Sequence, residues 1–141
     1  MGRNNLYNVI IDTNVIVSAI LSKDKTSPTI RVLELLFKNK VNLFYSEEIL
    51  DEYIDVLTRE KFKFEKELID YVIQAIVMKG NKINSDKIDM DLIDIKDKPF
   101  YELVMDKRIN DGKLITGNLK HFPIQINIIT PRQFIDMYDS K

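Results

Sequence analysis

The sequence predicts an α/β fold with a central parallel sheet of about five strands. Two observations support this prediction. Short apolar runs typical of buried strands alternate with segments of helical periodicity, an order that right-handed crossovers join into one parallel sheet. The 141 residues are 45% hydrophobic and 30% charged, and they contain no repeat, linker or low-complexity stretch. A composition of this kind is globular, so we expect a single domain over residues 1–141.

Three segments are expected to form buried strands: residues 6–11 (LYNVII), 41–45 (VNLFY) and 113–116 (KLIT). The first is rich in β-forming residues and ends in a continuous apolar run, as in a strand covered on both faces. Residues 126–130 (INIIT) predict a fourth strand, and residues 81–84 (NKIN) are a candidate for a fifth.

Five helices are expected between or after these strands. Serine or threonine begins three of them, because these side chains cap the first backbone N–H groups of a helix, and proline fits the first helical position. Glycine after the third helix predicts its end. The expected helices follow Ser27-Pro28, follow Ser46, cover residues 65–79 before Gly80, cover residues 97–108 before a turn at 110–112, and follow Thr130-Pro131.

Polar residues follow three of the predicted strands. Ligands of parallel sheets bind beyond the carboxyl ends of the strands, so these residues are expected to meet at one edge of the sheet. They are Asp12-Thr13-Asn14, Ser46 and Thr116-Gly117-Asn118.

Three acids are candidates for a site at this edge, and each has a structural alternative. Asp12 directly follows a buried strand, where a carboxylate must be hydrogen-bonded or hold a cation. It is therefore either a metal ligand or a cap of the turn that follows. Glu52 lies within a helix at the border of its apolar face, where it is either a ligand or a boundary charge. Asp97 precedes a helix, where it is either a ligand or an N-cap.

Several other kinds of site are excluded by missing residues. The chain has no cysteine and one histidine, His121, and it contains no G-x-S-x-G, no zinc-ligand spacing and no glycine-rich nucleotide loop. A phosphatase with an aspartate nucleophile would need an acid where Asn14 stands. Oxygen ligands remain, and these suit Mg²⁺ or Mn²⁺.

Net charge and hydropathy bear on partners and location. The net charge of −1 does not indicate a nucleic-acid binder, although a local basic face can coexist with it. No apolar stretch approaches the roughly 20 residues of a membrane span, and MGRNNLYN lacks the layout of a secretory signal. We therefore expect a cytoplasmic protein with no membrane partner.

Four segments, in this order, resemble the PIN-domain family of small Mg²⁺- or Mn²⁺-dependent nucleases, which includes toxins of toxin–antitoxin pairs. VIIDTNVIVSAI resembles the opening strand and turn, and SEEILDEYIDVL resembles the helix that carries the second acid. DIKDKPFYELV resembles the third-acid segment, and LITGNLKHFP followed by INIITPRQF is similar to the closing part. The resemblance covers nearly the full length.

This resemblance implies a three-layer α/β/α sandwich and a site that binds Mg²⁺ or Mn²⁺. It implies that Asp12, Glu52 and Asp97 are catalytic metal ligands. Many members carry an aspartate where this chain has Asn118, whose amide oxygen can ligate a hard cation but brings no charge. Supporting roles are expected for Thr13 and Asn14, which would form the turn that aims Asp12, for Ser18, for Thr116 as a brace of the Asn118 loop, and for Asp94 as a substitute acid.

The implied function is a metal-dependent endoribonuclease that hydrolyses RNA phosphodiesters, as the toxin of a toxin–antitoxin pair. The alternative is a catalytically degenerate domain that binds nucleic acid or a protein partner without cleavage. A homodimer and a small antitoxin protein are the expected partners besides RNA. Candidate RNA contacts, each also interpretable as a solvated charge, are Arg59, Lys61, Lys63 and Lys120.

Overall fold

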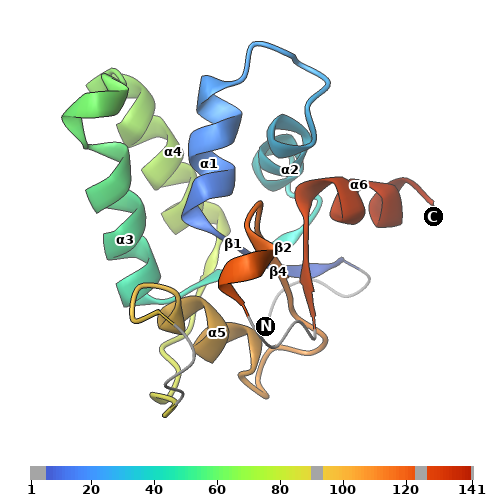
Figure 1. Ribbon diagram of the computed structural model, residues 1–141. Helices are drawn as coiled ribbons and strands as arrows, with labels where there is room; N and C mark the ends of the chain where they lie inside the picture. The colour runs from blue at the N-terminus through green and yellow to red at the C-terminus, as the bar shows by residue number, and fades with distance from the viewer. Residues whose placement is uncertain (1–5, 90–93, 123–126, 141) are drawn as a thin grey trace.

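The computed structural model describes residues 6–89, 94–122 and 127–140, and its centre is a parallel sheet (Figure 1). The five strands lie in the order β3-β2-β1-β4-β5. Every neighbouring pair is parallel, which agrees with the predicted α/β class. The strands are β1 (Asn8–Ile11), β2 (Asn42–Tyr45), β3 (Asn81–Lys82), β4 (Lys113–Ile115) and β5 (Ile128–Ile129).

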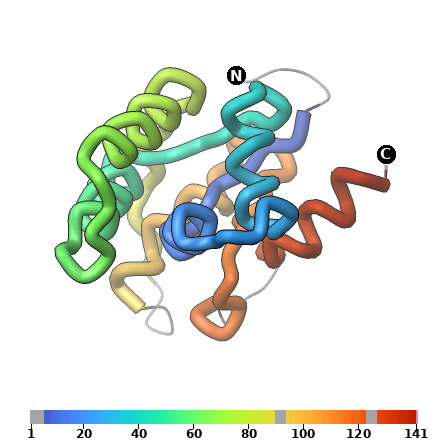
Figure 2. Tube along the Cα trace, turned by 90° about the horizontal axis from the view of Figure 1, so that it is seen from above, coloured from blue at the N-terminus to red at the C-terminus, as the bar shows by residue number. Residues whose placement is uncertain are grey.

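Helices cover both faces of this sheet, which gives the predicted three layers. Among the described residues, six α-helices form: α1 (Thr13–Leu21), α2 (Pro28–Phe37), α3 (Glu47–Leu57), α4 (Lys66–Lys79), α5 (Lys98–Val104) and α6 (Pro131–Asp139). In Figure 1, α5 lies below the strands, against β1 and β4, whereas α1, α2 and α4 lie above them. Figure 2 shows α3 and α4 side by side on one side of α1, with α6 on the other. None of the described helices is long and apolar enough to cross a membrane.

The change of face by α5 follows from the strand order. The chain moves from β1 to β2 to β3 in one direction across the sheet and then returns past β1 to β4. Right-handed crossovers place the connecting helices of the two directions on opposite faces. The sheet is therefore buried on both sides, and Val9, Ile10 and Leu114 in its central strands are fully inaccessible to solvent.

The predicted caps are present at three helices. The side chain of Ser27 accepts a hydrogen bond from the Ile30 N–H at 3.3 Å, and that of Ser46 accepts one from the Ile49 N–H at 3.2 Å. Thr130 forms a full capping box with Gln133. These helices start where predicted, because the cap signal is local in the sequence.

The start of α1 is the main difference from the expected structure. Thr13 and Asn14 were expected to form a turn, but they are the first two residues of a nine-residue helix. The segment VIVSAI has β-branched residues that favour strands, and the contacts of α1 with α2 and α3 override that preference. All five predicted strands are longer than the observed ones; β1, for example, begins at Asn8, and β3 ends at Lys82. The helix α5 is also shorter than predicted and ends at Val104, where the turn held by Asp106 and Arg108 follows. Residue 126 of the predicted fourth strand lies outside the described residues.

Gly80 follows α4 as predicted, but for a different reason. Its φ of −86° is not the left-handed conformation of a glycine C-cap. A Cβ atom at Gly80 would lie 2.6 Å from the Ile76 carbonyl oxygen and 2.9 Å from the Tyr45 ring. Glycine is therefore required by the close approach of the helix end to β2.

Candidate functional site

Asp12 and Thr116 directly follow β1 and β4, the two strands between which the chain reverses its direction across the sheet. The Asp12 N–H donates to the Ile115 carbonyl at 2.9 Å, so the ends of the two strands are joined. In open parallel sheets, ligands bind outside the carboxyl ends of the strands at this reversal point. The topology therefore places a site beside Asp12.

The Asp12 carboxyl group is buried, and a hydrogen bond holds it. Only 7% of the residue is exposed, and the Thr116 hydroxyl donates to Oδ2 at 2.6 Å. Burial raises the pKa of Asp12 above its ordinary value, and the nearby charge of Glu52 raises it further. The Thr116 hydrogen bond and the Thr13 N–H oppose this shift without cancelling it. Negative charge at this position is therefore only partly compensated by the protein.

Glu52 reaches the same region from the middle of α3. The Thr13 hydroxyl at the start of α1 donates to its Oε2 at 3.0 Å. The next residue, Tyr53, is fully buried, and its hydroxyl donates to the Ile11 carbonyl at the end of β1. Burial raises the pKa of Tyr53 well above its usual range, and the charges of Asp12 and Glu52 add to the shift. Tyr53 thus stays protonated and joins the helix that carries Glu52 to the strand that carries Asp12.

Replacing Tyr53 with Phe is expected to lower the free energy of unfolding by about 1–3 kcal/mol, because the Ile11 carbonyl loses a buried donor. Urea denaturation followed by circular dichroism measures this change. Tyr71→Phe is the matched control, because Tyr71 is 60% exposed and its substitution should change the free energy of unfolding by less than about 0.5 kcal/mol. Equal stability of Tyr53→Phe and the wild type would contradict the role given to this hydroxyl.

Asp97 occupies the N-cap position of α5, but its side chain does not cap the helix. Burial raises the pKa of Asp97 to about 6, and the charge of Asp12 is the next cause, with smaller contributions from Asp94 and Glu52. The mutual effects on pKa mean that Asp12, Glu52 and Asp97 lie close enough to repel one another.

Neither Asp12 nor Asp97 caps a helix with its side chain, although both were candidates for N-caps or turn caps. Asp12 also stands at an N-cap position, that of α1, and its side chain makes no capping hydrogen bond either. By contrast, Ser27, Ser46 and Thr130 all cap their helices with their side chains. The two aspartates therefore precede helices without capping them, and their carboxyl groups contact Thr116 and His121 instead.

The loop after β4 is attached to this region by three hydrogen bonds. The Asn118 N–H donates to the Thr116 hydroxyl oxygen at 3.1 Å, and that hydroxyl in turn donates to Asp12. The Gly117 N–H donates to the Asn14 side-chain oxygen at 3.3 Å. These hydrogen bonds attach the loop that carries Asn118 to the start of α1 and, through Thr116, to Asp12.

His121 belongs to the same site, which the sequence analysis missed. Its Nδ1 lies 3.6 Å from Asp97 Oδ2, and its Nε2 lies 3.0 Å from Asn118 Nδ2. Residues 119–121 form a 3₁₀ turn that begins after Asn118. Side chains at i and i+3 eclipse each other in such a turn, so the spacing Asn-x-x-His was the available signal.

The remaining predicted residues are exposed, and three of them contact side chains or backbone other than the three acids of the site. Ser18 is exposed on α1, one turn beyond Asn14, and Asp94 is exposed with its carboxylate accepting the Lys96 N–H at 3.0 Å. Arg59 pairs with Asp55 at 3.1 Å, and Lys61 lies 5.0 Å from the centre of the Phe62 ring. Lys63 and Lys120 are exposed.

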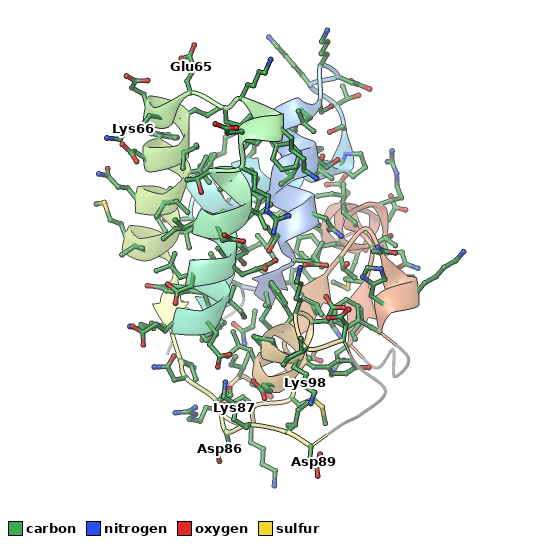
Figure 3. The ribbon with its side chains drawn as sticks, turned by 60° about the vertical axis from the view of Figure 1, so that its left-hand side comes forward. Glu65, Lys66, Asp86, Lys87, Asp89 and Lys98 are labelled. Carbon is green, nitrogen blue, oxygen red and sulfur yellow. The ribbon has the colours of Figure 1, made fainter. Side chains whose placement is uncertain are left out.

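These basic residues divide into two places. Arg59, Lys61 and Lys63 follow the end of α3, whose last residue, Leu57, lies about 7.5 Å along the helix axis from Glu52. Figure 3 shows Lys66, which follows this segment, at the opposite end of the molecule from Lys98, the neighbour of Asp97. Lys120 instead lies in the turn that carries His121.

The donor atoms at this site fit a hard divalent cation. They are carboxylate and amide oxygens with hydroxyl support, the ligand type that Mg²⁺ and Mn²⁺ prefer. Within the described residues, however, no group of three or more acidic, histidine or cysteine side chains is placed so that it could hold a metal ion without rearrangement of the side chains. Burial is the largest cause of the raised pKa values of Asp12 and Asp97, and neighbouring acids raise both values further. A bound cation would favour the charged form of both acids.

Comparison with known protein families identifies the family of this chain. A comparison with curated proteins finds no significant match. The family model described as "PIN domain" matches residues 8–120, which include β1, the three acids and the Asn118 loop. The match covers most of the 141 residues. The chain belongs to the PIN-domain family.

Proposed function

We propose that this protein is a metal-dependent endoribonuclease that hydrolyses RNA phosphodiesters. PIN domains are generally nucleases and typically use divalent metal ions. One observation of this chain carries the proposal: three acids from separate segments are each held by a neighbour at the same edge of the sheet. Thr116 holds Asp12, Thr13 holds Glu52, and His121 lies against Asp97. Three acids that repel one another at the carboxyl edge of a sheet are costly for a fold and useful for binding a cation.

In this proposal Asp12, Glu52, Asp97 and the Asn118 carbonyl oxygen would hold Mg²⁺ or Mn²⁺. When bound, such an ion supplies Lewis-acid stabilisation of the scissile phosphate and a lowered pKa for an attacking water. The residues of the chain provide the fixed geometry. Thr116 and Thr13 each donate a hydroxyl to one carboxylate, so these two acids are oriented before substrate arrives.

The substrate has to be brought to an acidic site, and basic side chains are proposed to do this. Lys120 lies close to the acids along the chain, whereas Arg59, Lys61 and Lys63 lie past the end of α3. The separation of the two groups favours a substrate that extends over several nucleotides. The stacked rings of Phe62 and Phe64, with centres 5.2 Å apart, stand beside the second group and offer a surface for bases.

The biological role proposed is that of a toxin in a toxin–antitoxin pair, acting as a homodimer and inhibited by a small antitoxin protein. Membership of the PIN-domain family supports this role, because the family includes toxins of toxin–antitoxin pairs. Growth arrest on expression, relieved by the product of an adjacent reading frame, tests the role. Light scattering of the purified protein tests the dimer.

A direct test of the chemistry compares Glu52→Gln with Asp51→Asn in a cleavage assay on mixed RNA with Mn²⁺. Glu52 accepts the Thr13 hydroxyl at the site, whereas its neighbour Asp51 is exposed. Loss of an outer partner of a metal ligand typically costs 10–100-fold, so loss of a ligand itself should reduce cleavage by at least about 100-fold. Asp51→Asn should change cleavage less than about twofold.

Two outcomes would contradict the proposal. Cleavage by the wild type that persists in EDTA would exclude the metal-dependent mechanism. Equal loss in Glu52→Gln and Asp51→Asn would show a general electrostatic effect and not a site. Parallel reactions with single-stranded DNA measure the preference for RNA.

The second candidate function is binding without cleavage, and Asn118 favours it. An amide in place of a carboxylate reduces the formal charge available to hold a cation. Titration calorimetry with Mn²⁺ separates the candidates. The enzyme is supported if the wild type cleaves RNA and binds Mn²⁺, and if Asp97→Asn abolishes the Mn²⁺ binding. The second candidate is supported if the wild type binds RNA but neither cleaves it nor gives a heat of Mn²⁺ binding.

A further inference from the structure

The side chain of Asn118 is held by His121 in a way that distinguishes its two ends. Asn118 Nδ2 lies 3.0 Å from His121 Nε2. An amide nitrogen has only hydrogens to offer, so it donates, and the ring nitrogen accepts. Within the described chain, the carbonyl end of this amide has no hydrogen-bond donor.

The tautomer of His121 then follows from this hydrogen bond. If Nε2 accepts, the proton of the neutral ring is on Nδ1. Nδ1 faces Asp97 Oδ2 at 3.6 Å, so a donor is directed at a carboxylate. The ring therefore accepts a hydrogen bond from Asn118 on one side and faces Asp97 on the other, and both contacts agree with one tautomer.

The backbone supports the same arrangement. The His121 N–H donates to the Asn118 carbonyl at 3.1 Å, which closes the 3₁₀ turn and places the two side chains beside each other. The Asn118 N–H is fixed separately by the Thr116 hydroxyl. Asn118 is thus anchored at its backbone toward Asp12 and at its amide nitrogen toward His121.

We propose that His121 is a positioning residue that fixes the Asn118 amide so that its carbonyl oxygen, and not its NH₂ group, is presented to a divalent cation. This inference rests on the proposed function, because it concerns the same metal site. A carboxylate at position 118 would have two equivalent oxygens and would need no such partner. An amide has one useful end, and turning its NH₂ group toward a cation would oppose binding.

A double-mutant cycle in Mn²⁺ affinity tests this proposal, with titration calorimetry on the full chain and no substrate. His121→Ala is expected to weaken Mn²⁺ binding by about tenfold in the natural background, as loss of an outer partner does. In the Asn118→Asp background the same change should weaken binding by less than about twofold. The Asp97 contact is lost in both backgrounds, so the difference isolates the orientation of the amide.

Arg132→Ala is the control, because Arg132 is exposed on α6, outside the site, and its loss should leave the Mn²⁺ affinity within about twofold. Unfolding curves verify that each variant is folded, which is expected because the His121 side chain is 55% exposed. Rescue of RNA cleavage by Asn118→Asp in the His121→Ala protein is a second expected result.

The outcomes separate the inference from the proposed function. Unchanged affinity in His121→Ala, or an equal loss in both backgrounds, overturns the orienting role while the metal site stands. A wild type that neither binds Mn²⁺ nor cleaves RNA overturns the proposed function, and the inference with it.

Discussion

Replacing Asp12 with Asn is expected to reduce Mn²⁺-dependent RNA cleavage by at least about 100-fold and, without metal, to leave the protein folded and somewhat more stable. The activity should fall because Asp12 is the acid at the reversal point of the sheet, and the Thr116 hydroxyl holds it in place. Asn keeps the size of the side chain and can still accept the Thr116 hydrogen bond. The change therefore removes charge with little effect on packing.

The stability of this variant should change in the opposite direction to its activity. Burial raises the pKa of Asp12, so the charged form is less favourable in the folded chain than in the unfolded chain. At neutral pH the wild type carries this cost and the Asn variant does not. Urea denaturation in EDTA measures the gain, and a cleavage assay with excess Mn²⁺ measures the loss.

Asp136→Asn is the control, because Asp136 is exposed on α6 and its change should alter neither quantity appreciably. A destabilised Asp12→Asn protein would contradict the cost assigned to the buried charge and would make its loss of activity uninformative. Full cleavage activity would remove Asp12 from the mechanism.

Most of the fold could be predicted from local sequence signals. Apolar runs locate the central strands because both faces of the sheet are covered, and serine or threonine caps fix the starts of α2, α3 and α6. The helix α1 could not be predicted, since its apolar, β-branched residues fit a strand equally well. Its contacts with α2 and α3, which the sequence does not reveal, decide its conformation.

The site divides in the same way between local and distant information. Asp12, Glu52 and Asp97 could be proposed from their positions after a strand, within a helix and before a helix. The threonine partners could not, because Thr116 reaches Asp12 across 104 residues and Thr13 reaches Glu52 across 39. These pairs exist only after β1 has joined β4 and α1 has packed on α3. His121 is only three residues from its partner Asn118, but the contact could not be predicted without knowing that residues 119–121 form a 3₁₀ turn.

Replacing Asp97 with Asn is expected to stabilise the metal-free protein at pH 7.5 and to have almost no effect at pH 4. The pKa of Asp97 is raised to about 6 from its ordinary value of 3.8. In the wild type, the stability contributed by this group therefore falls as pH rises from about 4 to about 6, and it stays low above that range. The Asn variant does not titrate, so the difference between the two proteins should grow through the same interval.

The size of this difference follows from the shift and from the exposure of the group. A shift of this size corresponds to about 3 kcal/mol without screening. Because solvent reaches part of the Asp97 carboxyl group, about 1 kcal/mol is expected, which is about 3 °C in Tm for a chain of this length. Thermal unfolding in EDTA at pH 4, 6 and 7.5 measures it, with Asp51→Asn as the exposed control.

Adding Mn²⁺ at pH 7.5 should reverse the order of the two proteins. A ligand that binds only the folded state stabilises it by RT ln(1 + [L]/Kd), so the wild type gains more than a variant with weakened binding. The charge that destabilises the metal-free protein is then the charge that holds the ion. If Mn²⁺ raised the Tm of both proteins equally, Asp97 would be a buried acid with no part in the metal site, and its raised pKa would need another explanation.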